Sequence, residues 1–261
     1  MSGADPEIFP PRVWIEGIAV DAFANKAAFF RRMVYEAQKP GQSFMYYLNV
    51  HVANLAYKSP SLKSILQRGT FVYCDGSGIQ KASLLLKGDK IPIRLANGDW
   101  LFELWDYLGQ QGCRMFYLGG EPGIAEKGLS RYAAHNPHHT FVGSHHGFIL
   151  NDPQLEAQVI QQINATQPDI LFLGMGCPLQ EFWVEKHKDE LQVSLFYHIG
   201  ASMDYIANKI PRCPVFLGDM GLEWLFRLLN EPLRLCHRYL IGNPWFMSRI
   251  LWQAVKQRLT V

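Results

Sequence analysis

The residue best suited to act as a general base is Asp75, which directly follows the apolar run Phe71-Val-Tyr-Cys74. It opens the turn Asp75-Gly-Ser-Gly78, which leads into a predicted helix. Burial at the end of a strand would raise the pKa of its carboxyl toward that of a useful base, whereas the adjacent helix N-terminus would oppose the rise. An alternative interpretation makes Asp75 the N-cap of the helix that begins at Ser77. The residue pattern leaves both interpretations open.

A second turn with chemical potential follows the apolar run at 170–173. Gly174-Met-Gly176 allows a sharp turn, and Pro178 suits the first turn of a helix that also contains Gln180-Glu181. A strand that ends in Gly-x-Gly and leads into a helix N-terminus makes a site for an anionic group. An ordinary tight connection between strand and helix explains the glycines equally well. The two polar side chains that follow favour a pocket.

The elements that would position these turns alternate along the chain. The hydrophobic periodicity predicts strands at 13–20, 43–48, 71–74, 114–118, 140–142, 170–173 and 193–199. It predicts helices at 24–37, 53–68, 94–110, 122–134 and 154–166, and one that begins at Ser77. This alternation is typical of an α/β fold with a doubly wound parallel sheet. The carboxyl ends of parallel strands share one edge, so the sequence predicts that the residues at these ends converge there: Asn49, Asp75, Gly119-Gly120, Gly147-Phe148, Gly176 to Glu181 and Asp204.

The composition excludes several classes of protein. With 48% hydrophobic and 18% charged residues, the 261-residue chain is an ordinary globular protein. A net charge of +2 gives no field that would attract nucleic acid. The five cysteines lie far apart, so neither disulfides nor structural zinc are expected. The N-terminus lacks the features of a signal peptide, and no run of eighteen apolar residues suggests a membrane span.

The sequence contains no P-loop and no Asp-x-Asp pair, which many nucleotide-sugar enzymes use to hold a divalent metal on the diphosphate. We therefore expect no metal and no cofactor. Without a metal, a leaving diphosphate would need cationic side chains, and the C-terminal arginines are the obvious supply.

The C-terminal segment from 222 to 261 differs in composition from the rest of the chain. It contains six Lys or Arg against two acids, a net charge of +4, together with six Trp, Phe or Tyr residues. Short helices broken at Pro232 and Pro244 are expected. Basic helices interleaved with aromatic residues suit a membrane interface or an anionic ligand. A helical cap on the sheet, with its charges in solvent, explains the pattern equally well.

These residues belong to an ordered set of motifs. The set consists of Asn49; Asp75-Gly-x-Gly78; Gly119-Gly120; Gly147-Phe148; Gly176-x-Pro-x-Gln-Glu181; Gly200 to Asp204; Pro211-Arg-x-Pro214; Leu222-Glu-Trp-x-x-Arg-Leu228; and Glu231-Pro-x-Arg234. The set resembles the WecG/TagA/CpsF glycosyltransferases of bacterial polysaccharide and teichoic acid assembly, over residues 45–240. The resemblance implies a Rossmann-like catalytic core at 1–210. It also implies a basic and aromatic helical appendage at 211–261, which completes the active site at the membrane.

The resemblance further implies an inverting, metal-independent transfer from a UDP-sugar to a polyprenyl-diphosphate-linked sugar. Members use N-acetylmannosamine, its uronic acid or glucose, so the donor sugar stays open. The expected partners are the donor, the lipid-linked acceptor and a membrane surface, with no nucleic acid and with a homo-oligomer left open. The expected location is the cytoplasm, peripheral on the inner face of the plasma membrane, in exopolysaccharide or cell-surface glycan synthesis.

By the same resemblance, Asp75 is the general base, and Asn49 and Gln180 line the reacting centre. Further residues are expected around the nucleotide-sugar: Gly119, Gly120, Gly147, Phe148, Gly176, Glu181 and Asp204, with Phe148 and Asp204 near the uracil. Arg227 and Arg234 are expected at the diphosphate.

The sequence departs from the family pattern at two positions. Tyr47 stands where some members have Thr, which places a polar role at that position in doubt. His237 stands where another Arg is frequent, and the neighbouring Arg238 would substitute for it.

Two rival functions are weighed against the transferase. A non-catalytic UDP-sugar-binding subunit of a polysaccharide assembly complex would have no need of Asp75 and the arginines together. A dinucleotide-dependent oxidoreductase would have G-x-G-x-x-G after its first strand, which this sequence lacks.

Overall fold

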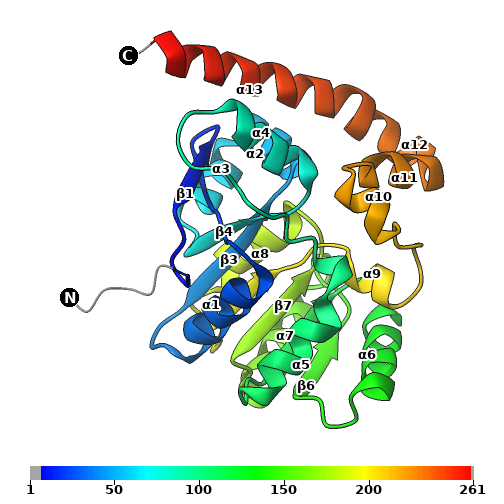
Figure 1. Cartoon of the computed structure of the whole chain (residues 1–261). Helices are drawn as coiled ribbons and strands as arrows, with labels where there is room; N and C mark the ends of the chain where they lie inside the picture. The colour runs from blue at the N-terminus through cyan, green and yellow to red at the C-terminus, as the bar shows by residue number, and fades with distance from the viewer. Residues whose placement is uncertain (1–6, 260–261) are drawn as a thin grey trace. The chain divides into compact units, whose positions relative to one another are not determined.

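Strands and helices alternate along the chain in a computed structural model that describes residues 7–259 (Figure 1). The strands are β1 (Arg12–Ile15), β2 (Ile18–Asp21), β3 (Ser43–Leu48), β4 (Phe71–Cys74), β5 (Met115–Gly119), β6 (Phe141–His145), β7 (Ile170–Gly174) and β8 (Leu195–His198). They pair in the order β1-β2-β4-β3-β8-β7-β5-β6, and the assigned pairings are parallel apart from β1 with β2. This confirms the predicted α/β fold with a mostly parallel sheet.

The helices fall between and after these strands. Those up to β8 are α1 (Lys26–Gln38), α2 (Val50–Lys58), α3 (Pro60–Gln67), α4 (Ser77–Leu85), the 3₁₀ turn η1 (Asn97–Asp99), α5 (Leu101–Gln110), α6 (Ile124–His135), α7 (Pro153–Thr166) and α8 (Leu179–His187). The later ones are α9 (Ser202–Ile206), α10 (Val215–Asp219), α11 (Glu223–Asn230), α12 (Pro232–Cys236), the π-helix η2 (His237–Ile241) and α13 (Gly242–Leu259). No helix within residues 7–259 is long and apolar enough to cross a lipid bilayer.

The chain divides into two compact units. Unit 1 contains the chain up to residue 29, residues 46–96 and residues 212–261, and unit 2 contains residues 30–45 and 97–211. Strand β3 contributes to both, because its first three residues belong to unit 2 and its last three to unit 1.

Unit 2 has helices on both faces of its strands. Along β5 and β7, Phe116, Leu118, Leu171 and Leu173 face the side chains of α7 and α8 in one buried cluster. The alternate residues of these strands and of β8 form a second core with α5 and α6, in which the ring of Trp105 contacts Tyr132 and Phe172. A parallel strand that is buried on both faces reads as a continuous apolar run, which is why these strands could be identified from the sequence.

Unit 1 begins with a hairpin where the sequence predicted one strand at 13–20. β1 and β2 pair antiparallel around the two-residue turn Glu16-Gly17, whose φ angles are 50° and 82°. Positive φ at both turn residues gives the turn type whose twist matches a hairpin, and Gly17 adopts it without a Cβ penalty. The helix predicted at 53–68 is also divided, because Ser59 ends α2 and caps α3, which begins at Pro60.

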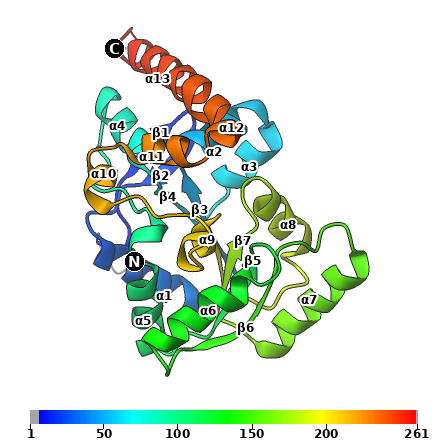
Figure 2. The same cartoon turned by 90° about the vertical axis from the view of Figure 1, so that its right-hand side faces the viewer.

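The C-terminal helices are part of unit 1. Helix α13 contacts α2 and α4 along its length, as both views show (Figures 1 and 2). Its inner face buries Phe246, Ile250 and Ala254. A helix break was predicted at Pro244, but this prediction is wrong, because α13 follows η2 without a gap and Pro244 is its third residue.

Candidate functional site

The carboxylate of Asp75 is held by Asn49 in unit 1. The Asn49 Nδ2 donates to Asp75 Oδ2 at 3.0 Å. The Asn49 Oδ1 accepts from the backbone N–H of Val52 at 3.0 Å, so Asn49 is also the N-cap of α2. The backbone N–H of Asp75 donates to Leu48 O at 2.9 Å, which ties the turn after β4 to the end of β3. One amide side chain therefore starts a helix and orients the carboxylate.

Asp75 is not the N-cap of α4. Gly76 occupies that position, and no side chain caps the helix there. The alternative interpretation of Asp75 from the sequence is therefore wrong, and its carboxylate is available to the cavity beside it.

The environment of Asp75 raises the pKa of its carboxyl to about 6, mainly because the group is buried. The nearby Glu223 carboxylate raises it further, whereas the Asn49 hydrogen bond and the charges of Arg212 and Arg227 lower it. A carboxylate with a pKa near the working pH is suited to accept a proton from a hydroxyl.

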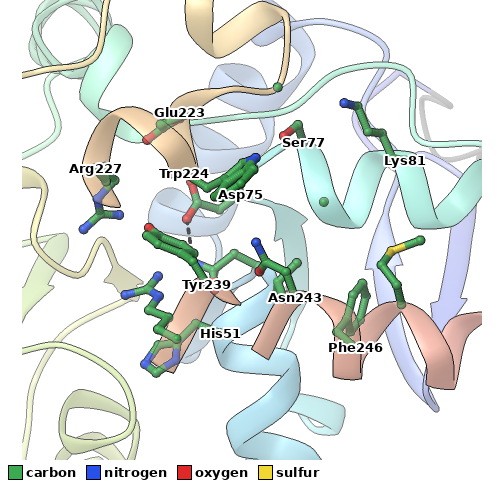
Figure 3. A pocket seen from close by; sticks show the side chains of 17 residues that line it. His51, Asp75, Ser77, Lys81, Glu223, Trp224, Arg227, Tyr239, Asn243 and Phe246 are labelled. Carbon is green, nitrogen blue, oxygen red and sulfur yellow. Dashed lines mark hydrogen bonds between the residues drawn. The ribbon is translucent and has the colours of Figure 1, made fainter. Parts of the chain in front are cut away.

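Asp75 opens into a cavity of about 230 Å³ (Figure 3). The cavity is built by the ends of β3 and β4, the first turns of α2 and α4, and the C-terminal helices α11, η2 and α13. Its lining includes two of the predicted arginines, Arg227 and Arg238, together with Asn49 and Asp75. The C-terminal segment thus contributes charged groups to the cavity that contains the candidate base.

The arginine side of this cavity is strongly positive. Burial, together with the charge of Arg227, lowers the pKa of Arg238, and the buried Nε of Arg238 has no hydrogen-bond partner among residues 7–259. His51 lies on the same side (Figure 3). Burial and the charges of Arg238, Arg227 and Arg234 lower its pKa to about 4, so its ring is neutral at pH 7. Cationic donors held this close together suit an anion such as a diphosphate.

Arg234 and His237 lie outside the cavity lining. The Arg234 guanidinium is exposed and makes two hydrogen bonds to the Glu231 carboxylate, at 2.6 and 2.7 Å. His237 is exposed, whereas its neighbour Arg238 lines the cavity, as expected if Arg238 takes the place of the missing arginine. Tyr47 is buried against the ring of Tyr73 and is not part of the cavity lining.

Sequence reasoning did not assign a role to Glu223. Its carboxylate accepts from Arg94 at 3.5 Å and from Arg212 at 3.0 Å, and Glu223 also lines the cavity. Arg212 and Glu223 both belong to the ordered motif set, and this was the available signal. Their partnership could not be read from the sequence because the two residues are eleven positions apart in different elements.

Unit 2 contains a larger cavity of about 540 Å³. Five of the residues expected near the nucleotide-sugar line it: Gly120, Gly147, Phe148, Gly176 and Asp204. Phe148 is 66% exposed, so its ring is free to stack. Lys209, also in the lining, pairs with Glu121 at 2.7 Å and with Asp204 at 3.7 Å.

Three predicted residues of unit 2 do not line this cavity. Gln180 is fully buried, with its Oε1 accepting from Gly176 N at 3.2 Å and its Nε2 donating to Glu181 Oε1 at 2.9 Å. Glu181 is buried as well, and burial raises the pKa of its carboxyl. A Cβ on Gly119 would lie 2.4 Å from the Cα of Gly174, so Gly119 permits the close approach of β5 and β7. These residues support the cavity wall, and their direct contact with a ligand stays a prediction.

No group of three or more His, Cys, Asp or Glu side chains between residues 7 and 259 is arranged to hold a metal ion.

Comparison with known proteins gives one consistent result. The family model described as "Glycosyl transferase WecG/TagA/CpsF family" matches residues 13–260. The chain is 26% identical over 209 residues to the N-acetylglucosaminyldiphosphoundecaprenol N-acetyl-beta-D-mannosaminyltransferase of Bacillus spizizenii (strain ATCC 23059 / NRRL B-14472 / W23), covering 80% of this chain and 79% of that protein. It is 26% identical over 213 residues to the protein of the same name from Staphylococcus aureus (strain MW2), covering 82% of this chain and 81% of that protein.

Proposed function

Because the chain belongs to the WecG/TagA/CpsF family of glycosyl transferases, we propose that it moves a sugar from a UDP-sugar to a polyprenyl-diphosphate-linked sugar, with inversion and without a metal. One observation carries the proposal. A carboxylate with a raised pKa, oriented by Asn49, lies in the same cavity as Arg227 and Arg238. A base and a diphosphate site are the two groups that a metal-independent displacement needs.

In the proposed mechanism, Asp75 accepts the proton of the acceptor hydroxyl as the hydroxyl oxygen attacks the anomeric carbon of the donor. The bond from that carbon to the diphosphate breaks in the same step, and UDP leaves with the electron pair. Asn49 orients the base and lines the reacting centre. Arg227 and Arg238 stabilise the charge that develops on the leaving diphosphate, which is where electrostatic stabilisation contributes most. Arg234 contributes at longer range, since its charge already acts on His51.

The donor nucleotide is assigned to the cavity of unit 2. Phe148 stacks on the uracil and Asp204 accepts from it, while Gly120, Gly147 and Gly176 let the nucleotide approach the backbone. The exposed ring of Phe148 and the unobstructed space at Gly176 support this assignment. Gln180, Glu181 and Gly119 act behind this surface by holding the turn after β7.

The relatives' names describe transfer of N-acetylmannosamine onto N-acetylglucosaminyl-diphospho-undecaprenol. UDP-N-acetylmannosamine is therefore the first donor to test here, followed by its uronic acid and UDP-glucose. Because the proposed acceptor is linked to a lipid, we propose that the enzyme acts at the inner face of the plasma membrane, in exopolysaccharide or cell-surface glycan synthesis. The outer face of α13, which exposes Leu251, Trp252, Val255 and Leu259, would contact the bilayer. In this proposal residues 1–210 are the catalytic core and 211–261 the appendage.

The test is UDP release by the purified chain with each donor and with a synthetic sugar-diphosphate-lipid acceptor, in the presence of EDTA. We expect turnover with one donor and no loss of rate in EDTA. Binding of UDP without turnover of any donor would instead indicate a non-catalytic subunit. Activity that is lost in EDTA and restored by magnesium or manganese would contradict metal independence.

A further inference from the structure

The cavity around Asp75 has a second cationic end, which no role described so far explains. Lys81 of α4 lines the cavity, and in Figure 3 it lies on the opposite side of Asp75 from Arg227 and His51. The two ends differ in character, since the arginine end is crowded with cations. The Lys81 end combines one ammonium group with the hydroxyl of Ser77 and the aromatic ring of Phe246.

From this geometry we propose that the Lys81 end binds the diphosphate of the lipid-linked acceptor, separately from the arginines that bind the diphosphate of the donor. The inference rests on the proposed function, because it assigns one of its two substrates to one end of the cavity.

The position of the Lys81 ammonium is defined by its neighbours. A Cβ on Gly221 would lie 2.5 Å from Lys81 Nζ and 3.3 Å from Ser77 Oγ, so ammonium and hydroxyl both lie against the same glycine. Gly221 has a φ of 80°, which also favours glycine. The Lys81 ammonium thus fills the place beside Gly221 where α4 meets the segment before α11, and the Ser77 hydroxyl lies against the same glycine.

The charge of Lys81 is not neutralised by the other carboxylate of the cavity wall. Glu223 is engaged by Arg94 and Arg212. Ser77 is the first residue of α4, and Gly76, its N-cap, provides no side chain to the first-turn N–H groups. An ammonium, a hydroxyl and an uncapped helix N-terminus are a frequent combination for binding phosphate.

The reaction geometry explains why this end suits the acceptor. In an inverting displacement, the attacking oxygen and the leaving diphosphate lie on opposite sides of the anomeric carbon. If Arg227 and Arg238 hold the leaving group, the acceptor approaches Asp75 from the other side. Its own diphosphate then lies near Lys81.

The lipid chain has an apolar route from this end. Phe246 and Met247 of α13 line the cavity, and the outer face of the same helix exposes Leu251, Trp252 and Val255. A prenyl chain attached to a diphosphate at Lys81 would therefore meet apolar side chains on leaving the cavity. Such an apolar surface would not raise the affinity for a soluble nucleotide.

The test is equilibrium binding of farnesyl diphosphate, farnesol, inorganic pyrophosphate and UDP to the full chain, by calorimetry. We expect Lys81→Ala to lower the affinity for farnesyl diphosphate by about tenfold, the usual effect of losing one hydrogen bond to a charged group. Farnesol and UDP should bind the variant as they bind the wild type. Lys81→Arg should bind farnesyl diphosphate within about twofold of the wild type. Pyrophosphate should bind more weakly than farnesyl diphosphate, and equal binding of the two would overturn the assignment of this end to a lipid-linked diphosphate.

The matched control is Lys87→Ala, which removes an exposed lysine outside the cavity and should change no affinity. The inference is overturned if Lys81→Ala binds farnesyl diphosphate as tightly as the wild type does, or if the variant loses as much affinity for UDP. It is also overturned if the wild type does not bind farnesyl diphosphate. The binding assay needs no turnover. If the affinity for farnesyl diphosphate depends on Lys81 but the chain has no transferase activity, only the proposed function is rejected. If Lys81→Ala transfers sugar with an unchanged KM for the acceptor, only the Lys81 subsite is rejected.

Discussion

The two cavities are built in different ways. In unit 1, the turn after β4 supplies the Asp75 carboxylate, which a hydrogen bond from Asn49 orients. Helices α4, α11 and η2 supply the cations Lys81, Arg227 and Arg238. In unit 2, the predicted residues that line the cavity are three glycines, Phe148 and Asp204. In the proposed function, unit 1 therefore supplies the chemistry, whereas unit 2 supplies shape for the donor. Substitutions in unit 1 should therefore lower kcat, and substitutions in unit 2 should mainly raise the donor KM.

The largest effect is expected from Asp75→Asn. Loss of the general base should lower transfer by roughly two to four orders of magnitude, with UDP affinity unchanged. Because burial raises the pKa of the native carboxyl, its contribution to stability is lost as the pH rises through about 6. The variant should therefore unfold at no lower a temperature than the wild type at pH 8. A variant with near-normal turnover would exclude Asp75 as the base.

A smaller effect is expected from the arginines. Arg227→Ala and Arg238→Ala should each lower kcat by about 10- to 100-fold, because each removes a charge-assisted bond to the leaving diphosphate. Arg234→Ala serves as the comparison, because the Arg234 guanidinium is exposed and paired with Glu231. This substitution should lower kcat by no more than about threefold. Equal losses in all three variants would mean that the net charge of the segment matters and its geometry does not.

In unit 2, Phe148→Ala should raise the KM for the UDP-sugar by about tenfold, the order expected for one aromatic ring stacked on a base. The kcat should stay within about twofold of the wild type. Phe182→Ala removes a partly exposed ring on α8 outside the cavity and is the matched control. If Phe148→Ala lowered kcat and left the donor KM unchanged, the division of roles between the two units would be wrong.

The smallest effect is expected from Asn49→Ser. Serine is also an effective N-cap, so α2 keeps its first-turn bond, but the donor to Asp75 is lost. That bond lowers the pKa of Asp75, so its loss should shift the acidic limb of the pH–rate profile to higher pH by about one pH unit. Thermal unfolding that matches the wild type would confirm that the cap is intact. An unmoved profile would show that Asn49 does not act on the base.

The sequence predicted most strands well because their signals are local. Apolar runs between turn residues identified β3 and β4 with their observed ends, and β7 to within one residue. The hairpin of β1 and β2 was missed, because the single strand predicted at 13–20 includes Glu16-Gly17, whose positive φ angles form a turn between two short apolar runs. The long helix at 53–68 was wrong for a similar reason, since Ser59-Pro60 was not weighed against the periodicity around it.

The candidate site was predictable where a residue acts alone and less so where it acts through a partner. The position of Asp75 after a buried strand suggested a base, and its hydrogen bond to Asn49 supports that reading. The neutral state of His51 and the engagement of Glu223 by two arginines depend on residues distant in the chain. Lys81 was missed because a lysine on a predicted helix carries no signal until the fold brings it to the cavity wall.

The most direct test of the central claim is the pH dependence of kcat/KM for the lipid acceptor, which reports groups of the free enzyme. If Asp75 is the base, the wild-type value should rise with a slope of one up to an apparent pKa of about 6 and then level off. Asp75→Asn should lose this inflection along with its rate. A wild-type profile that is flat between pH 5 and 7, or an inflection near pH 6 that persists in Asp75→Asn, would contradict the account.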